Sequence, residues 1–206
     1  MEVRVIGCLL EKQRTTPDAY PLSLNALRLA CNQSTAREPV VRFEEQEIRD
    51  ALHRLGRRRW TRLASGAGSR ASKYRHLLDE TLGLSREEQA VLAVLALRGP
   101  QTSGELRSRT ERLFHFGTAD EVEAVLARLG ERGLAARQLR RPGQKEERFA
   151  HLLSDELEEA PETEAPALAP IAAAAPAADH RVERLEREVE TLKAQVAELR
   201  AELGME

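Results

Sequence analysis

The stretch Ala51-Leu52-His53-Arg54-Leu55-Gly56-Arg57-Arg58 returns 74 residues later as Val125-Leu126-Ala127-Arg128-Leu129-Gly130-Glu131-Arg132. Tyr74-Arg75-His76-Leu77-Leu78 returns 75 residues later as Phe149-Ala150-His151-Leu152-Leu153. Between these ends, each copy carries a glycine-containing turn, at residues 65–68 or 141–144. A helix followed by a short hairpin, repeated once, predicts two copies of one small domain. A domain that ends in this way is most often a winged helix, which points to binding rather than to chemistry.

Apolar periodicity and capping patterns predict the same order of elements in both copies. In the first copy we expect helices at residues 2–12, after Tyr20-Pro21 and at 44–58, then strands near 60–64 and 71–78. In the second we expect helices at 90–97, at 103–113 and after Thr118, then a hairpin at 134–153. Ser85 with Glu88, and Thr118 with Glu121, form capping-box patterns. The predicted fold is mainly α with small β-hairpins (α+β), with winged-helix domains at residues 1–78 and 79–153.

The third helix of each copy carries an apolar stripe at the i, i+3, i+4, i+7 spacing of a buried helix face. The stripes are Ile48, Ala51, Leu52 and Leu55 in the first copy and Val122, Val125, Leu126 and Leu129 in the second. The opposite faces should then be exposed. They carry Gln46, Arg49, Asp50, His53 and Arg57 in the first copy and Asp120, Glu123, Ala124, Ala127 and Glu131 in the second.

Two further segments follow the repeat. Residues 154–178 are rich in alanine, proline and acids without an apolar stripe, so we expect a flexible linker. Residues 179–206 show a heptad pattern, which predicts a coiled-coil helix and a homodimer, with the parallel pairing favoured over the antiparallel one. The predicted dimerisation residues are Val182, Leu185, Val189, Leu192, Val196, Leu199 and Leu203.

Charge is distributed unevenly along the chain. The net charge is −2, but residues 1–78 hold 15 Lys and Arg against 8 Asp and Glu. Residues 79–153 hold 12 of each, and residues 51–78 contain no acid at all. Only the first copy therefore has the electrostatics of a nucleic-acid binder. The alternative interpretation is a solvated basic edge without a ligand.

The predicted DNA contacts follow from where a winged helix meets duplex DNA. Phosphate contacts are expected from the end of the third helix and from the hairpin, whereas bases would be reached from the exposed helix face. Glu44, Glu45 and Glu47 at the start of this helix suit the helix dipole but would repel phosphate, and capping explains them as well as any functional role. The predicted DNA-binding residues are Arg49, His53, Arg57, Arg58, Arg59, Arg62, Arg70 and Lys73.

The acidic and small residues on the third helix of the second copy would repel phosphate. We therefore expect that copy to serve packing or to bind a protein partner. Two functions stay open. The chain is either a DNA-binding transcriptional regulator that contacts DNA through its first copy, or an interaction scaffold in which both domains bind protein.

Catalysis has little support in the sequence. The five histidines are scattered, none has the spacing of a metal site, and no phosphate-binding glycine loop is present. His76 and His151 match across the repeat, so a shared structural role is expected for them. No stretch is apolar enough to span a membrane, and the N-terminus lacks the pattern of a signal peptide. We expect a non-enzymatic cytoplasmic protein without cofactor or metal, in which Cys8 and Cys31 are buried free thiols.

Several long motifs resemble the YceH family, bacterial tandem winged-helix proteins without an established function. They are Glu11-Lys12, Thr15-Thr16-Pro17, Tyr20–Asn25, Cys31-Asn32-Gln33, Arg37–Val40, the turn at 65–68 with Lys73-Tyr74, and a stretch within residues 97–107. The resemblance covers residues 2–153 and implies the fold but no activity. Ser34 and Ser103 stand where the family usually has lysine and proline, and the first difference removes one candidate phosphate contact.

The polar residues of this signature have two interpretations. They are Thr16, Tyr20, Asn25, Asn32, Gln33 and Arg37. They either cap helix ends and order the loop, or they form a recognition surface beside the basic hairpin. The first interpretation is favoured.

Overall fold

The computed structural model describes residues 1–64, 72–138 and 146–154 of the chain. The predicted hairpin tip with Gly66, Gly68 and Arg70 lies outside these residues. So do nearly all of the linker predicted at 154–178 and the whole tail at 179–206 with its seven heptad positions. The domain boundaries remain predictions.

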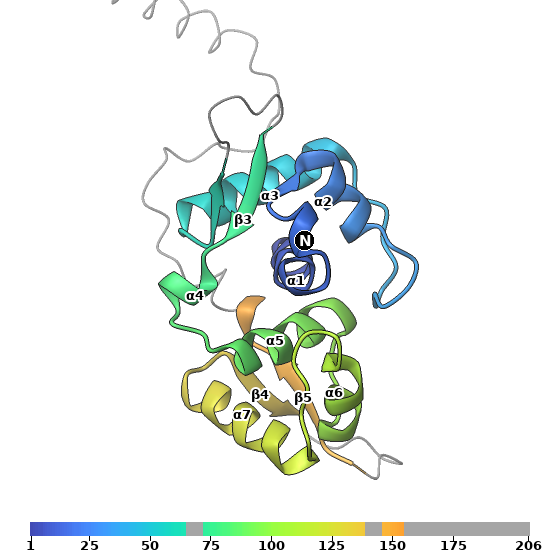
Figure 1. Cartoon of the computed structure of the whole chain (residues 1–206), viewed down its shortest axis with the longest axis vertical. Coiled ribbons are helices and arrows are strands. Elements are labelled where there is room, and N and C mark those ends of the chain that lie inside the picture. Colours follow the sequence, from blue (N-terminus) through green and yellow to red (C-terminus); the bar gives the residue numbers. More distant parts are fainter. Residues whose placement is uncertain (65–71, 139–145, 155–206) are drawn as a thin grey trace, which may run out of the picture. The chain divides into compact units, whose positions relative to one another are not determined.

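Apart from a short 3₁₀ turn, the elements of the first half follow the order helix, strand, helix, helix, strand, strand (Figure 1). They are α1 (Glu2–Thr15), the 3₁₀ turn η1 (Pro17–Ala19), β1 (Leu22–Ser23), α2 (Leu24–Cys31), α3 (Glu45–Arg57), β2 (Thr61–Leu63) and β3 (Lys73–His76). The short helix α4 (Leu78–Thr81) leads to the second half. The strands form one antiparallel sheet in the order β1-β3-β2.

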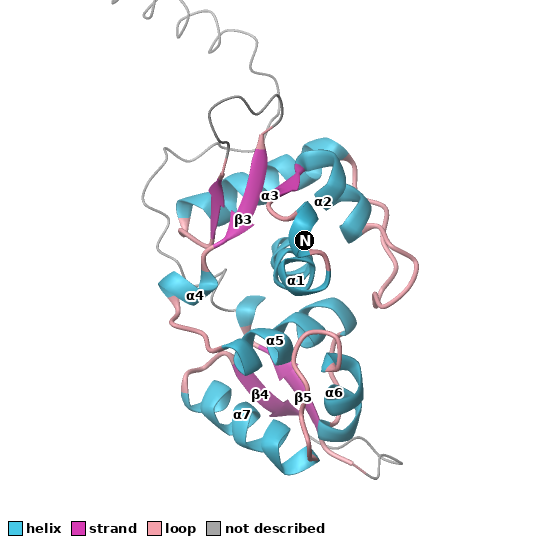
Figure 2. Cartoon of the chain, viewed as in Figure 1, coloured by secondary structure: helices cyan, strands magenta, loops and turns pink. Residues whose placement is uncertain are grey.

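The second half repeats this order (Figure 2). It contains α5 (Arg86–Arg98), α6 (Ser103–Thr110), α7 (Ala119–Glu131), β4 (Ala135–Gln138) and β5 (Arg148–His151). β4 and β5 pair antiparallel, and a single bridge between Gln101 and Phe149 takes the place of β1. The described part of the chain is therefore mainly helical with small antiparallel sheets, which confirms the predicted α+β class.

The hairpin registers coincide in the two halves. Thr61 faces His76 in the first hairpin, and Ala135 faces His151 in the second. Thr61 and Ala135 differ by 74 residues, whereas His76 and His151 differ by 75, so the two offsets in the sequence both follow from one shared register. The bridge extends the match, because Leu22 pairs with Tyr74 as Gln101 pairs with Phe149. The extra residue of the second copy falls between its two strands.

Side-chain caps start three of the helices in the second half. The predicted box at Ser85 and Glu88 is confirmed, and Thr102 with Glu105 forms a box that the sequence analysis missed. The box predicted at Thr118 is only half formed. Thr118 Oγ1 accepts from the backbone N of Glu121 at 3.3 Å. The Glu121 carboxylate instead accepts from Gly117 N at 3.0 Å, because the preceding amide lies within its reach.

The core lies where the helical stripes predicted it. All eight stripe residues of α3 and α7 are buried, as are Trp60 at the base of the first hairpin and the free thiols Cys8 and Cys31. α1 and α5 pack against each other and join the halves. They approach closely at Gly7, where a Cβ would lie 2.9 Å from Leu97 Cγ.

A few boundaries differ from the prediction. α1 continues to Thr15, three residues beyond its expected end at residue 12. α6 ends at Thr110, three residues before its expected end at residue 113. β1 was not predicted at all. Within the ranges that the structure describes, no helix combines the length and apolarity needed to cross a membrane.

Candidate nucleic-acid interface

The exposed face of α3 carries the residue types that the periodicity placed there. Gln46, Arg49, Asp50, His53 and Arg57 are all exposed, while the opposite face packs in the core. Two contacts link neighbours along this face. Arg49 Nη2 lies 2.9 Å from Glu45 Oε1, and Gln46 Nε2 donates to Asp50 Oδ1 at 2.8 Å. Both ends of the Arg49 pair are more than half exposed, so a ligand could displace the pair at small cost.

The glutamates at the start of α3 have the capping role that was expected. Glu47 Oε2 accepts a hydrogen bond from the backbone N of Glu44 at 2.8 Å, and Glu45 pairs with Arg49. These carboxylates suit the positive end of the helix dipole. They place negative charge at one end of the exposed face, so the cationic part of that face lies toward the C-terminal end of α3.

Three exposed arginines follow one another across the junction from α3 to β2. Arg57 ends the helix, Arg59 lies in the connection and Arg62 lies in the strand. In the described part of the chain, none of the three has an acidic partner within ion-pair distance. Guanidinium groups without a competing carboxylate among the described residues suit the binding of an external anion such as phosphate.

The remaining predicted residues differ in availability. Arg58 is half-buried, and its guanidinium carbon lies 5.8 Å from the ring centroid of Trp60. Lys73 is half-buried at the start of β3. His53 is exposed, and Arg70 lies outside the described residues. The structure thus brings Arg57, Arg58, Arg59 and Arg62 to one helix–strand junction, with Arg49 and His53 along the adjoining helix.

Arg62 lies directly opposite Arg75 across the first hairpin. Opposed residues in an antiparallel pair project from the same face, so two like charges are neighbours there. Arg75 Nη2 lies 2.6 Å from Glu80 Oε1, which neutralises one of them. The register places Ala136 opposite Ala150 at the equivalent position of the second hairpin. The same outward site therefore holds two arginines in one copy and two alanines in the other.

The second copy also differs along its third helix. Glu123, Ala127 and Glu131 stand at the repeat positions of Arg49, His53 and Arg57, and all three are exposed. Several arginines of this half are held in ion pairs instead. They are Arg128 with Glu87, Arg132 with Glu88, Arg137 with Glu147 and Arg148 with Glu105, at 2.8–3.3 Å. The cationic surface is therefore a property of the first copy.

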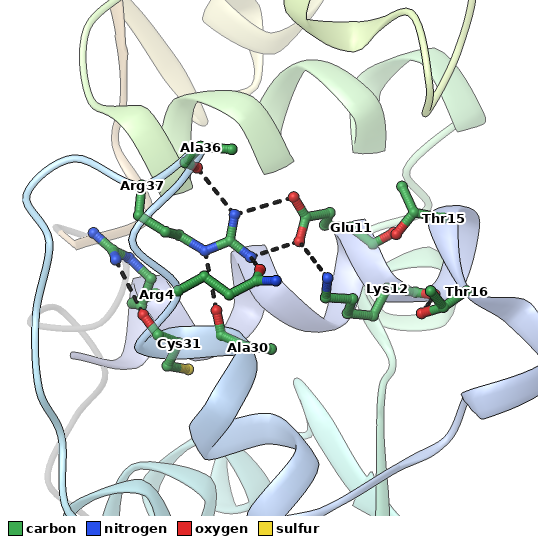
Figure 3. A network of polar contacts seen from close by, with 10 residues as sticks. Arg4, Glu11, Lys12, Thr15, Thr16, Ala30, Cys31, Ala36 and Arg37 are labelled. Atoms are coloured by element: carbon green, nitrogen blue, oxygen red, sulfur yellow. Dashed lines mark hydrogen bonds and ion pairs between the residues drawn. The ribbon is translucent and has the colours of Figure 1, made fainter.

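The signature residue Arg37 lies in the loop between α2 and α3, and its side chain is buried (Figure 3). Its Nη1 and Nη2 donate to the two carboxylate oxygens of Glu11 at 3.1 and 2.6 Å, and its Nε donates to Ala30 O at 3.1 Å. Nη2 also donates to Gln33 Oε1 at 2.7 Å. Burial disfavours the charged form of Arg37. The hydrogen bonds to Glu11, together with the nearby Cys8, outweigh burial and raise the pKa of Arg37.

Other signature residues hold the same part of the fold. Asn32 binds both backbone groups of Phe43, each at 2.8 Å, and so closes the loop. Arg4 Nη2, which the sequence analysis did not single out, donates to Pro39 O at 2.8 Å. Tyr20 accepts from the backbone N of His76 at 2.8 Å, and burial raises its pKa to about 12. These contacts favour the structural interpretation of Tyr20, Asn32, Gln33 and Arg37.

Thr16 and Asn25 make only local contacts. Thr16 Oγ1 donates to Lys12 O at 3.2 Å, and Asn25 Oδ1 accepts from Arg28 at 3.2 Å. His76 is buried at the end of β3, which agrees with a structural role for that histidine. Among the residues that the structure describes, no cluster of three or more His, Cys, Asp or Glu side chains could hold a metal ion.

These features define a duplicated helix-and-hairpin protein in which one copy presents a basic face. The chain belongs to the family described as "Protein of unknown function, DUF480", which matches residues 1–144. It is 51% identical over 202 residues to the UPF0502 protein azo0627 of Azoarcus sp. strain BH72, covering 97% of this chain and 88% of the relative.

Other relatives carry the same family name. A UPF0502 protein of Shewanella loihica is 48% identical over 207 residues, covering 96% of this chain and 95% of the relative. A UPF0502 protein of Vibrio vulnificus, VVA1225, is 46% identical over 208 residues, covering 98% and 94%. UPF0502 is the YceH family, so the resemblance drawn from the sequence motifs is confirmed.

Proposed function

We propose that each half is a winged helix and that the first one binds duplex DNA through α3 and its hairpin, without catalysis. The observation that carries this proposal is the run of exposed arginines Arg57, Arg59 and Arg62, which have no acidic partner among the described residues. Phosphate contacts come from these arginines with Arg58, Arg70 and Lys73. Arg49 and His53 face the bases.

The order of elements supports the assignment to the winged-helix fold. In that fold the third helix enters the major groove, and the hairpin extends along the backbone beside it. The charge difference between the copies supports a single DNA-binding unit. A protein with such a surface is suited to act as a cytoplasmic transcriptional regulator, with the tail at 179–206 forming a coiled-coil homodimer.

Duplex binding is tested by fluorescence anisotropy with mixed-sequence DNA at about 50 mM salt and above. Six phosphate contacts give a log–log salt slope near −5. The variant R57Q/R59Q/R62Q should bind more weakly and have a slope shallower by roughly 3. Its substitutions fall on exposed side chains, so the fold should remain intact.

A matched control removes the same charge from the second half. R86Q/R107Q/R112Q also neutralises three exposed arginines without an ion-pair partner among the described residues. It should keep most of the wild-type affinity, since a general charge effect is screened over the distance between the halves. Equal losses in both variants would assign the binding to net charge alone. No duplex binding at about 50 mM salt would reject the DNA function.

The alternative is an interaction scaffold that binds protein through both halves. The observation that favours it is the exposed face of α7, where small residues lie between acids: Asp120, Glu123, Ala124, Ala127 and Glu131. Absence of duplex binding, together with salt-sensitive binding of a protein partner that charge reversal at Glu123 and Glu131 abolishes, would establish this function in place of the first.

A further inference from the structure

The exposed faces of α3 and α7 carry opposite charges at equal spacing. Arg49, His53 and Arg57 recur every four residues on α3, and Glu123, Ala127 and Glu131 do so on α7. In each helix the outer two positions lie eight residues apart, which is about 12 Å along the axis. When the two helices are laid antiparallel, the first position of one stripe therefore meets the last position of the other, and the last meets the first.

That alignment pairs each arginine with a glutamate. With His53 over Ala127, Arg49 lies opposite Glu131 and Arg57 lies opposite Glu123. The small Ala127 leaves room for the imidazole. A parallel alignment gives the pairs Arg49–Glu123 and Arg57–Glu131 over the same centre. We propose that α3 of one molecule docks on α7 of a second copy of this chain, stripe against stripe.

Exposed glycines near the ends of both helices add an independent observation. Gly56 and Gly130 both lie in α-helix. A Cβ on Gly56 would have no atom within 4 Å, and one on Gly130 would lie 3.7 Å from Ala135 O, an ordinary van der Waals contact. A glycine inside a helix costs up to about 1 kcal/mol relative to alanine, and no contact within the described chain requires it at position 56. In the antiparallel alignment Gly56 lies opposite Ala124 and Gly130 lies opposite Asp50, whereas in the parallel alignment the two glycines face each other. Each glycine therefore allows a neighbouring backbone to approach closely.

The two faces belong to different molecules because of the way the halves pack. α3 packs on α1, α7 packs on α5, and α1 contacts α5. Figure 1 shows α1 and α5 lying between α3 and α7. The faces of α3 and α7 that point away from this packing cannot meet within one chain, so only a second copy can bring them together.

The occupant of the α7 face is protein rather than nucleic acid, because Glu123 and Glu131 repel phosphate. Surface ion pairs stabilise by at most about 1 kcal/mol each and are screened by salt. The docking is therefore weak and salt-sensitive. It also covers the α3 face that the proposed function assigns to DNA, so on that function self-docking and duplex binding compete.

Cysteine crosslinking between two full-length chains tests the contact. One chain carries H53C and the other A127C, while the native Cys8 and Cys31 are buried. The control replaces H53C with D18C, an exposed position on η1. With a thiol oxidant at low salt, the H53C–A127C disulfide should form about tenfold faster than the D18C–A127C disulfide, as expected for two surface ion pairs. Equal rates would overturn the proposal.

Charge reversal separates docking from chance collision. Adding E123R and E131R to the A127C chain should reduce the rate to that of the control. Adding R49E and R57E to the H53C chain should then restore it, since the charges are complementary again. Crosslinking that is unchanged by reversal, or a double reversal without recovery, would overturn the docking.

Duplex DNA supplies a separate readout for the competition. A duplex that binds the wild-type chain should slow the H53C–A127C disulfide. If the disulfide forms with the expected charge dependence while no duplex binds, the docking stands and the DNA function fails. If a duplex binds and the disulfide forms no faster than the control, the DNA function stands and the docking fails.

Discussion

Arg59 has a backbone conformation that L-residues seldom adopt. Its φ is +60°, and the equivalent residue of the second copy is Gly133 with φ +69°. The backbone contacts agree in detail, because Arg59 N donates to Gly56 O as Gly133 N donates to Gly130 O, both at 3.0 Å. A left-handed conformation costs a non-glycine residue about 1 kcal/mol or more. Arginine at this position, with its side chain exposed, suggests that the side chain serves binding rather than stability.

Replacing Arg59 with glycine should separate the contribution of its side chain to DNA binding from the effect of its backbone conformation on stability. R59G relieves the backbone strain, while the greater freedom of glycine in the unfolded chain offsets part of the gain. We expect a free energy of unfolding that is unchanged or up to about 1 kcal/mol higher, together with a DNA salt slope shallower by about 0.9. Chemical denaturation and anisotropy titrations measure the two quantities. A loss of stability with unchanged DNA affinity would assign Arg59 a structural role.

His76 is buried as the neutral imidazole. Its Nδ1 accepts from the backbone N of Leu78 at 3.3 Å, so the proton lies on Nε2, which donates to Gln13 Oε1 at 2.8 Å. Burial lowers the pKa of His76 to about 4, although Asp79 opposes that shift. Protonation therefore favours the unfolded chain, whose histidine titrates near 6.5.

The stability of the fold should follow this titration. The contribution of His76 is complete above pH 6.5 and is lost as the pH falls toward 4. Between pH 7.5 and 4.5, the free energy of unfolding of the wild-type protein should fall by about 2 to 3 kcal/mol more than that of H76N. Urea denaturation at several pH values measures the difference. H53N, at an exposed histidine, should follow the wild type, and an identical pH dependence of H76N would contradict the assignment.

At the scale of elements, periodicity and capping predicted the helices and the hairpins well. The stripes around Ile48 and Val122 repeat the helical period, and their burial follows from that period alone. β1 could not be found in this way, because Leu22 and Ser23 form a strand only through pairing with Tyr74 and Lys73. Tertiary pairing, rather than local propensity, makes these two residues a strand.

The candidate site could be predicted only in part for a related reason. Charge counting located the basic region but could not show which arginines are neutralised by distant acids. Arg54 is paired with Glu2 and Arg75 with Glu80, and neither acid lies within the acid-free stretch 51–78. Arg37 gave no periodic signal, since its partners lie on other elements.

The contact between α1 and α5 gives a prediction for Gly7. A Cβ at this position would lie 2.9 Å from Leu97 Cγ and 3.0 Å from Ala96 Cβ. Overpacking costs about 1–3 kcal/mol, which exceeds the helix propensity that alanine gains over glycine. G7A should therefore lower the free energy of unfolding by roughly 0.5–2 kcal/mol. G56A, where the space is open, should raise it by up to about 1 kcal/mol. Thermal and chemical denaturation of both variants checks the opposite signs.

At the scale of the whole molecule, duplication has produced two different surfaces on one framework. The halves share a hairpin register and an ion pair between first and third helix, Arg54 with Glu2 and Arg128 with Glu87. Arg57 and Glu131 nevertheless occupy equivalent exposed positions with opposite charge. A shared core with opposed surfaces suits a protein that binds an anion through one half and a protein surface through the other.

If the tail forms the predicted coiled coil, it determines whether these surfaces act in pairs. A parallel coiled coil would join two basic faces, which raises the effective concentration of the second on DNA once the first has bound. Deleting residues 179–206 should therefore shift the mass in solution from twice the chain mass to once, and should lower the affinity for long duplexes more than for short ones. Sedimentation analysis and anisotropy titrations measure the two effects.

Two double variants test whether dimerisation depends on the heptad face of the tail rather than on the presence of the tail alone. L185K/L192K places charge at two of the seven predicted dimerisation residues and should give monomers, because a short coiled coil cannot bury paired lysines. A194K/A201K adds the same charge at two positions on the opposite side of the helix and should leave the dimer intact. Dimers in both variants would place the self-association in residues 1–178, and monomers in wild-type protein would reject the coiled coil. A dimer lost only in L185K/L192K would assign pairing to the heptad face, and the two basic halves would then reach DNA together.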